Sequence, residues 1–414
     1  MIGGRPVVYL HIGAMKTGTT FVQSLLMQNR EQLAAAGLLI PGKRWADQVH
    51  AVRDVLGGGL GYPNLGPKSR GAWGNLRHEI LAADAASIVS MEFLSFADPR
   101  RARRIVDSLA PADVHVVLTV RDATPAIPAL WQTNTRTGST DTWRSFMNDV
   151  RRAAGWANRW GRFSPSTPLR TFLRTQDVAY MVRTWRRVLP AGRIHVVTVP
   201  GPGAPRTLLW ERLAAVVGVP PETCTEPPAH ANESIGYPST ELLRRVNAQL
   251  GRVPAPDYNQ TVLEFLALRI LAARRDIETR ALLDRRTAEL GPAWNDRSRQ
   301  AIGELGIEVE GDLGELPTEL GDQHEELIVE DQPPPSDAEL LDAALPAERA
   351  MRRLIRRRAR RLTARGVEVD LPLGLGGPHP PRTWRSGSDP VEMAVRQVAG
   401  LVRTAMDLQR RLRG

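Results

Sequence analysis

The chain has 414 residues, with 55 basic and 45 acidic side chains and a single cysteine. This length is enough for one large domain with an appendage, and one cysteine excludes an intrachain disulfide and argues against a zinc cluster. No run of about eighteen apolar residues occurs, which predicts that no segment crosses a membrane. The N-terminus lacks the charged-then-apolar layout of a signal peptide, so the expected location is the cytoplasm.

The net charge of +10 is confined to the C-terminal tail. Residues 346–414 hold 16 arginines and 6 acidic residues, so the first 345 residues are formally neutral. Nearly all the basic residues are arginines, which together with abundant Ala, Gly and Pro is typical of a GC-rich bacterial genome. The basic excess is therefore a property of the tail and not of the domain that precedes it.

Short apolar strands and helices alternate along the first half of the chain. Strands are expected at residues 7–10, 87–91, 114–120 and 194–199, and helices at 21–36 and 99–109. Residues 41–73 are expected to be rich in loops. Buried apolar strands that alternate with helices are typical of a parallel sheet covered on both faces. The predicted fold class is therefore α/β, a three-layer parallel sheet, with a helical C-terminal appendage.

Three segments are expected along the chain. Residues 1–331 form the α/β domain, which is mostly helical after about residue 205. Residues 332–345 form a Pro-rich linker and a short helix. Residues 346–414 form a basic helical region whose last helix is expected at 390–412. The end of the α/β domain is acidic, because residues 304–331 hold 11 acids and no Lys or Arg.

The most informative segment is His11–Thr20, HIGAMKTGTT, which lies between a predicted strand and a predicted helix. A turn there gathers backbone N–H groups at a helix N-terminus, and Lys16 adds a full positive charge, so the segment predicts a phosphate-like anion site. The usual nucleotide loop, G-x-x-x-x-G-K-S/T, places Lys after the second Gly. Here Lys16 precedes Gly18, which argues against an ordinary ATPase or GTPase. The alternative is a Gly-containing turn with an incidental lysine. His11 is expected to pack against the turn or orient it.

This order of residues resembles the 5′-phosphosulfate loop of the sulfotransferases that use 3′-phosphoadenosine 5′-phosphosulfate (PAPS), whose pattern is roughly P-K-S/T-G-S/T-S/T. The resemblance covers about residues 5–315, and its specific residues are limited to this loop and Arg121. It implies a P-loop-type nucleotide-binding domain and transfer of a sulfuryl group from PAPS to a hydroxyl or amine of a small-molecule or carbohydrate acceptor. No metal is required in that family. The implied cofactor contacts in the loop are Lys16, Thr17, Gly18, Thr19 and Thr20.

Arg121 follows the strand expected at 114–120. In the sulfotransferases an Arg at the end of the corresponding strand binds the 3′-phosphate of PAPS, and its planar donor fork suits phosphate oxygens. The alternative is a structural pair with Asp122 or another carboxylate. The family usually has a Ser eight residues after this Arg, where this chain has Ala129. Gln132 or a later side chain would have to replace it.

Two residues are candidates for the general base that takes a proton from the acceptor. Glu92 follows the strand expected at 87–91, the place where cytosolic sulfotransferases have a His. It could instead cap the next helix or pair with an arginine. His50 is the competing base, because it lies in a predicted loop at 45–53 that could cover the acceptor site, although a lone loop His is often merely solvated. Lys16 would hold the sulfonate oxygens and neutralise charge on the departing phosphate.

The tail suggests several partners. Nine arginines fall between residues 349 and 365 without an aromatic residue, so base stacking is unsupported. Nucleic acid or an anionic membrane is therefore less favoured than docking on the acidic stretch 304–331, within the chain or across a homodimer. Two rival functions stay open: a P-loop kinase that uses ATP and magnesium, and a non-catalytic nucleotide-binding or interaction protein that works through its tail.

Overall fold

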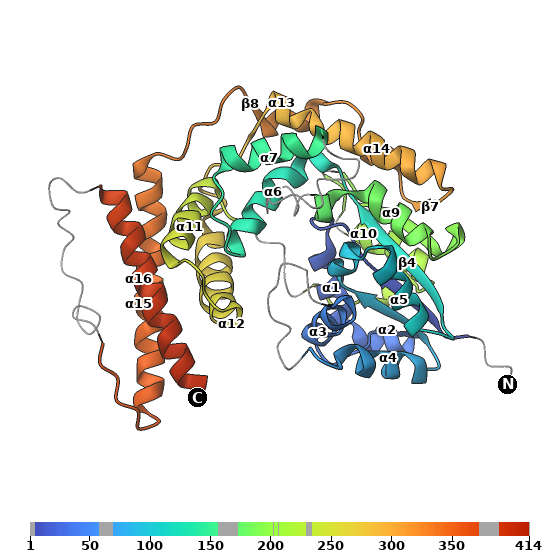
Figure 1. The fold of residues 1–414 in the computed structure, drawn as a ribbon, viewed down its shortest axis with the longest axis horizontal. Helices are drawn as coiled ribbons and strands as arrows, with labels where there is room; N and C mark the ends of the chain where they lie inside the picture. Colours follow the sequence, from blue (N-terminus) through green and yellow to red (C-terminus); the bar gives the residue numbers. More distant parts are fainter. Residues whose placement is uncertain are drawn as a thin grey trace. The chain divides into compact units, whose positions relative to one another are not determined.

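The computed structural model describes residues 5–57, 69–155, 173–201, 203–205, 207–228, 234–371 and 389–413 (Figure 1). The chain divides into two compact units. Unit 1 comprises Met1–Ile127, Val150–Asn232 and Arg286–Glu326, and unit 2 comprises Pro128–Asp149, Glu233–Arg285 and Leu327–Gly414. Packing thus groups two segments from the middle of the chain with the C-terminal helices, whereas the sequence suggested one boundary near residue 331.

Unit 1 is built on a six-stranded sheet with the order β2-β3-β1-β4-β5-β7. The strands are β1 (Val7–His11), β2 (Leu38–Leu39), β3 (Ala86–Ser90), β4 (Asp113–Val120), β5 (Ile194–Thr198) and β7 (Glu308–Glu310). Every paired strand in this sheet runs parallel to its neighbour. The predicted α/β class and parallel sheet are confirmed, and the four strands expected from the sequence lie within one residue of those observed.

Helices cover both faces of this sheet (Figure 1). On one face lie α1 (Thr19–Gln28) and α10 (Thr207–Val217), whose Val22 and Leu213 pack in one cluster with Val117 of β4. The opposite face is covered by α3 (Trp45–Leu56), α4 (Ala72–Ala82), α5 (Pro99–Ser108), α9 (Val178–Arg186) and α14 (Leu290–Glu304). Val116 and Leu118 of β4 point to that second face, because side chains alternate along a strand.

Helix α3 corrects the expectation that residues 41–73 are rich in loops. Val49, Val52 and Leu56 recur at helical spacing on α3 and are buried in the core of unit 1. The Asp47 carboxylate accepts a hydrogen bond of 3.0 Å from the Arg44 N–H and so satisfies one open donor of the first turn. Polar residues between these apolar positions hid the period. His50 therefore lies on a helix and not in a loop.

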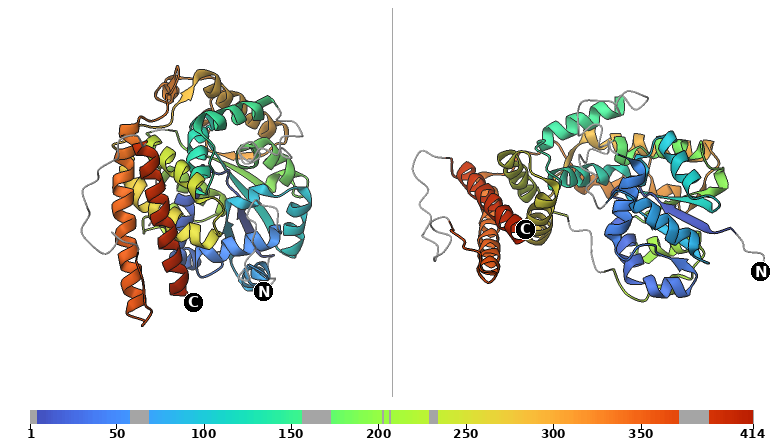
Figure 2. Two further views of the ribbon diagram at one scale, coloured as in Figure 1. Left: turned by 60° about the vertical axis from the view of Figure 1, so that its left-hand side comes forward. Right: turned by 60° about the horizontal axis from the view of Figure 1, so that its bottom comes forward.

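Unit 2 is helical. Its main elements are α11 (Tyr237–Leu250), α12 (Ala255–Tyr258), the π-helix η5 (Asn259–Leu271), α15 (Asp337–Thr363) and α16 (Pro390–Arg413). Helices α15 and α16 lie side by side (Figure 2), and their apolar faces share one core with α11 and η5. The helix expected at 390–412 is confirmed. Helix α15 runs unbroken through Pro346, so the short helix and the basic stretch that the sequence separated at this residue are one helix.

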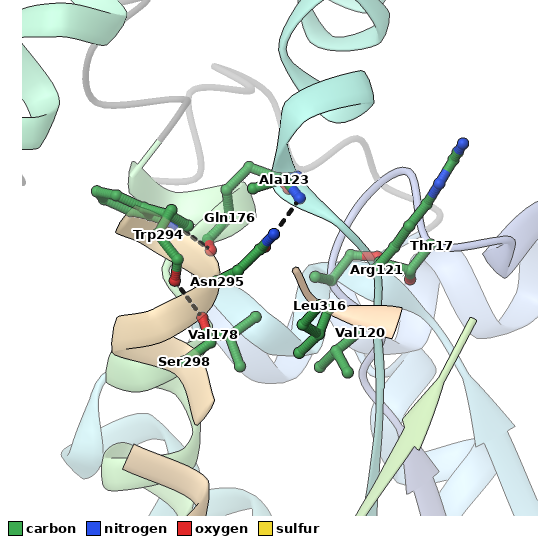
Figure 3. A pocket seen from close by; sticks show the side chains of 11 residues that line it. Thr17, Val120, Arg121, Ala123, Gln176, Val178, Trp294, Asn295, Ser298 and Leu316 are labelled. Atoms are coloured by element: carbon green, nitrogen blue, oxygen red, sulfur yellow. Dashed lines mark hydrogen bonds between the residues drawn. The ribbon is translucent and has the colours of Figure 1, made fainter. Parts of the chain in front are cut away.

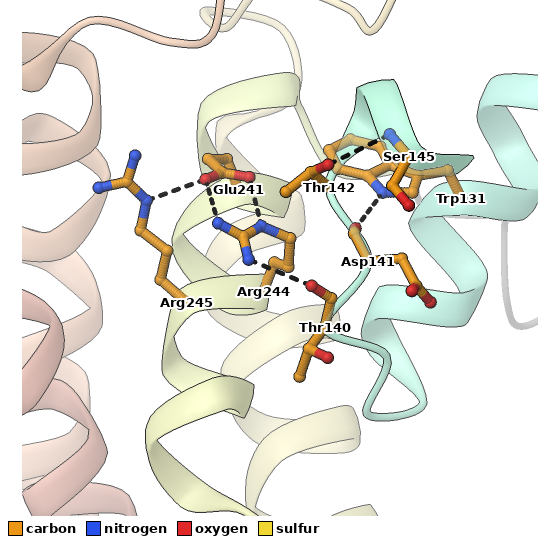
Figure 4. Close-up of polar contacts among 8 residues, drawn as sticks. All are labelled: Trp131, Thr140, Asp141, Thr142, Ser145, Glu241, Arg244 and Arg245. Carbon is orange, nitrogen blue, oxygen red and sulfur yellow. Dashed lines mark hydrogen bonds and ion pairs between the residues drawn. The ribbon is translucent and has the colours of Figure 1, made fainter. Parts of the chain in front are cut away.

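An ion network ties α11 to the connection between α6 (Ala123–Arg136) and α7 (Trp143–Gly155) (Figure 4). The Glu241 carboxylate accepts two hydrogen bonds of 2.7 Å from Arg244 and one of 2.9 Å from Arg245. Arg244 also donates to the Thr140 carbonyl at 3.1 Å, and the Trp131 indole N–H donates to the Asp141 carbonyl at 2.9 Å. These groups satisfy one another, so the network stabilises unit 2 and offers no open polar site.

Candidate functional site

Three predicted site residues follow three neighbouring strands of the sheet. Strand β1 lies between β3 and β4. Lys16 is in the loop after β1, Glu92 follows β3, and Arg121 follows β4. Because the three strands are parallel, their carboxyl ends share one edge, with the Lys16 loop between Glu92 and Arg121. Helix α1 then packs on one face and α5, after β3, on the other. Ligands of open α/β sheets bind at such a switch point.

The loop from β1 to α1 contains residues with left-handed backbone angles. Lys16 and Gly18 have φ angles of 69° and 82°, in the left-handed region. A Cβ on Gly18 would lie 2.6 Å from Leu209 Cδ2, so no other residue fits there without a shift. The backbone N–H groups of Thr17, Gly18, Thr19 and Thr20 donate no hydrogen bond among the described residues. They are therefore open to an anion at the start of α1.

Buried contacts fix this loop from below. The Thr17 hydroxyl donates to the Ala14 carbonyl at 2.5 Å and lies 2.6 Å from the Thr119 hydroxyl of β4. The Gln176 amide donates to the Met15 carbonyl at 2.8 Å. Thr17 is only 2 % exposed. Its side chain therefore anchors the loop, and only its backbone N–H can meet a ligand.

His11 is the centre of a polar network beneath the loop. Its Nδ1 lies 2.7 Å from the Ser90 hydroxyl of β3, and its Nε2 lies 3.3 Å from the Thr119 hydroxyl of β4. Complete burial lowers the pKa of His11 to about 4, so the imidazole is neutral at pH 7. The expectation that His11 packs against the turn or orients it is confirmed. The network joins three strand ends to the loop through Thr17.

Glu92 is held against α1 on the β3 side of the loop. The Gln23 amide donates to Glu92 Oε2 at 2.7 Å and to the Ser90 carbonyl at 3.3 Å. The Glu92 Cβ lies 3.7 Å from the position that a Cβ on Gly13 would take, so this carboxylate flanks the loop directly. Glu92 is half-buried and opens the 3-10 helix η1 (Glu92–Phe96). One carboxylate oxygen has a partner in Gln23, and the side chain is oriented rather than solvated.

The His50 side chain, unlike that of Glu92, does not face the edge of the sheet. On α3, Gln48 accepts a hydrogen bond of 2.9 Å from the Ser90 N–H and therefore faces the end of β3. His50 comes two residues later, about 200° further around the helix. Its Nδ1 lies 3.1 Å from the Ser69 hydroxyl. The face of α3 that meets the sheet edge is thus opposite the one that carries His50.

Arg121 and Asp122 are adjacent in the chain but differ in their side-chain contacts. The Arg121 side chain is exposed and makes no hydrogen bond or ion pair in the part of the chain that the structure describes. In Figure 3 it extends away from the other residues around it. Asp122 Oδ1 accepts hydrogen bonds from the Thr124 N–H at 3.0 Å and the Asn295 amide at 2.9 Å, and Oδ2 lies 2.7 Å from His324 Nε2. Asp122 is therefore engaged elsewhere and makes no hydrogen bond or ion pair with Arg121 among the described residues. Burial lowers the pKa of Arg121, and the negative charge of the neighbouring Asp122 partly opposes this shift.

Asn295 and His324 are site residues that the sequence did not reveal. His324 Nδ1 accepts a hydrogen bond of 3.1 Å from the Gly321 N–H, so Nε2 carries the proton that it donates to Asp122. Asn295 also accepts a hydrogen bond of 3.0 Å from the Ala123 N–H. The two side chains fix the turn that presents Arg121. They follow Asp122 by more than 170 residues, and no local pattern announces them.

A small pocket lies beneath this edge of the sheet (Figure 3). Thr17, Arg121, Gln176 and Asn295 are among the residues that line it, and the Trp294 indole N–H closes one side by donating to the Gln176 carbonyl at 2.7 Å. Its volume is about 10 Å³, room for roughly one water molecule. A nucleotide cannot enter it.

Metal sites and membrane spans are two other features that the described residues could form. No group of three or more His, Cys, Asp or Glu is placed to hold a metal ion, and no helix combines the length and apolarity that a bilayer span needs. Burial raises the pKa of the half-buried Cys224 thiol to about 11, so it is protonated and unreactive at pH 7. Comparisons of the chain with protein-family models, curated proteins and solved structures found no significant match.

Proposed function

We propose that this protein is a sulfotransferase of the P-loop-like class that takes PAPS as its sulfuryl donor. The observation that carries the proposal is the order of groups along the sheet edge: a carboxylate, an anion-binding loop with a lysine, and an arginine without a partner. A donor with a phosphosulfate at one end and a 3′-phosphate at the other needs two anion sites. Lys16 and Arg121 follow adjacent strands and supply two such positions.

The loop suits the 5′-phosphosulfate. Four open N–H groups and the Lys16 ammonium can hold its oxygens, and the buried threonine and histidine network keeps them in place before a ligand arrives. Lys16 then neutralises charge on the phosphate that departs. PAPS supplies the reactive S–O bond, and the protein supplies position and charge.

The two flanks of the loop suit different tasks. Arg121 on the β4 side can bind the 3′-phosphate through its planar donor fork without breaking an existing ion pair. Glu92 on the β3 side can accept the proton of an acceptor hydroxyl or amine, and Gln23 keeps its carboxylate beside the loop. The acceptor is a small molecule or a carbohydrate that approaches from this side.

A P-loop kinase is less well supported. Such an enzyme holds magnesium with a carboxylate beside the phosphates. Asp122 is the nearest carboxylate to Arg121 along the chain, and both of its oxygens are used by Thr124, Asn295 and His324. Glu92 does lie beside the loop, so the preference against a kinase rests on the order of the loop residues, because Lys16 precedes Gly18 and the ATP-binding loop places Lys after its second Gly. A non-catalytic nucleotide-binding protein would share the loop and Arg121 but would not need Glu92 beside them.

Thermal unfolding with two nucleotides tests the proposal. Adenosine 3′,5′-bisphosphate at a hundred times its Kd should stabilise the protein by about 2.7 kcal/mol, and ATP with magnesium should stabilise it less. Lys16→Ala should reduce the shift in Tm, whereas Lys43→Ala, which removes an exposed lysine outside the loop, should leave it unchanged. A larger shift with ATP and magnesium, or an unchanged shift in Lys16→Ala, would overturn the assignment.

A further inference from the structure

The outer face of α15 carries a row of arginines. Arg349, Arg353, Arg357 and Arg361 recur every fourth residue, and Arg360 lies beside them. These five residues, here called the arginine stripe, are all exposed. Residues four apart on a helix are neighbours about 6 Å apart along its axis, so the row spans roughly 18 Å.

The stripe has no counter-charge paired with it among the described residues. Its five arginines make no hydrogen bond or ion pair within the described ranges of the chain, and no acidic residue occurs between 349 and 367. The preceding acid, Glu348, is buried and accepts hydrogen bonds from Arg352 at 2.9 Å and Gln397 at 2.8 Å. Like charges at this spacing oppose helix formation, so the stripe favours an external anion.

Other arginines of unit 2 are already satisfied. On α16, Arg396 pairs with Glu392, and Arg410 and Arg413 both pair with Asp257. On α15 itself, Arg358 points inward and donates to the Thr261 hydroxyl at 3.0 Å and the Ala405 carbonyl at 2.7 Å. The stripe is therefore distinguished by its lack of partners and not by its arginine content.

The opposite face of α15 is unavailable. Met351, Leu354, Ile355 and Leu362 are buried in the core of unit 2. The helix therefore cannot lay an apolar face into a bilayer, as membrane-surface helices do. No aromatic side chain occurs in residues 346–371, so neither base stacking nor wedging between bases is available. What the stripe can offer is charge along a line.

We propose that the arginine stripe binds the phosphate backbone of duplex nucleic acid without reading its sequence. A duplex carries one charge per roughly 1.7 Å of its axis with both strands counted, so about ten phosphates lie along a length equal to the row, and roughly half of them face one side. Guanidinium groups hold phosphate oxygens in pairs. A row of guanidinium groups along a helix can follow a row of phosphates along a duplex. A flat membrane surface would contact only the arginines on the outermost line of the helix. This proposal is independent of the sulfotransferase assignment.

Fluorescence anisotropy with a labelled duplex of 20 base pairs and the full chain tests the proposal. The Kd at 50 mM NaCl should be micromolar or weaker and independent of sequence. With four or five phosphates contacted, the observed affinity should fall roughly 150- to 500-fold between 50 and 200 mM NaCl. The variant with Arg353, Arg357, Arg360 and Arg361 changed to Gln should lose binding. Arg357→Gln alone should lower the slope of log K against log salt by about 0.9.

A matched control separates the stripe from the total charge. Arg70, Arg77, Arg100 and Arg252 are exposed arginines elsewhere, and changing these four to Gln removes the same net charge. This control variant should bind the duplex within about threefold of the unmodified chain. Equal losses in the two quadruple variants would overturn the proposal. So would binding to phosphatidylserine vesicles without binding to the duplex, or an unchanged salt slope in Arg357→Gln.

Discussion

Two basic regions of this protein use positive charge in opposite ways. At the sheet edge of unit 1, Lys16 and Arg121 are single cations, each set by one backbone position after a strand. On α15 of unit 2, five arginines repeat along a helix face and none has a unique environment. As proposed, the first arrangement would place two anions at fixed positions, and the second would supply positive charge along a line. Single substitutions should therefore matter greatly at the edge and little on the stripe.

Buried polar groups hold Lys16 and Arg121 at fixed positions on the edge of the sheet. His11, Thr17, Thr119 and Ser90 bond to one another beneath the loop, and Asn295 and His324 hold Asp122. A buried network of this kind tolerates few changes, because removing one member leaves another without a partner. The α15 face has no such support.

The largest expected effect is on transfer at Glu92. Glu92→Gln keeps the hydrogen bond to Gln23 within reach but removes the proton acceptor, so the rate should fall by roughly 10²–10⁴-fold while the nucleotide Kd stays unchanged. His50→Ala should change the rate only a few-fold. The readout is release of adenosine 3′,5′-bisphosphate from PAPS with a panel of phenols, amines and sugars. A near-normal rate in Glu92→Gln with a large loss in His50→Ala would move the base to α3.

The next effect is on stability in acid. The native pKa of His11, about 4, lies below the ordinary value of 6.5, so the unfolded chain takes up this proton first as the pH falls. The stabilisation from a neutral His11 is complete above pH 6.5 and is lost between pH 6.5 and 4, by about 3 kcal/mol. His11→Gln should lack this dependence.

Hydrogen exchange of the β1 and β4 amides at pH 7 and pH 4.5 measures this difference within unit 1. The protection of the unmodified chain should fall more than that of His11→Gln over this interval. Parallel losses in the two proteins would show that His11 is not the group responsible.

The smallest effect separates two adjacent arginines of α15. Arg358→Met leaves the buried Thr261 hydroxyl and Ala405 carbonyl without their donor, so it should lower the free energy of unfolding by about 1–3 kcal/mol. Although burial lowers the pKa of Arg358 to about 10, it is still charged at pH 7. Arg357→Met, on the exposed stripe, should change the free energy of unfolding by no more than about 0.5 kcal/mol. Equal changes in thermal or urea unfolding would contradict the distinction.

The sequence predicted the parallel sheet and the candidates at its edge because both depend on local signals. Four apolar runs marked the strands, and a residue that follows a parallel strand lies at a known edge. Lys16, Glu92 and Arg121 were found in this way. The predicted loop around His50 was wrong, since α3 mixes polar residues with its apolar face and its period was overlooked.

Contacts between residues far apart in the chain could not be predicted from the sequence. Nothing near Asp122 indicates that Asn295 and His324 will engage its oxygens and leave Arg121 without a partner. The inward turn of Arg358 was equally hidden, because the sequence shows nine similar arginines and only packing selects the one that is buried. Pairings of this kind depend on the fold and not on neighbouring residues.

The most direct test of the central claim is whether Arg121 recognises a 3′-phosphate. Titration calorimetry would compare adenosine 3′,5′-bisphosphate with adenosine 5′-monophosphate on the unmodified chain and on Arg121→Gln. A hydrogen-bonded charge pair is worth about 1.5–3 kcal/mol, so the unmodified chain should bind the bisphosphate about 10- to 150-fold more tightly, and Arg121→Gln should lose most of that preference. Equal affinity of the unmodified chain for the two nucleotides, or an undiminished preference in Arg121→Gln, would contradict the account.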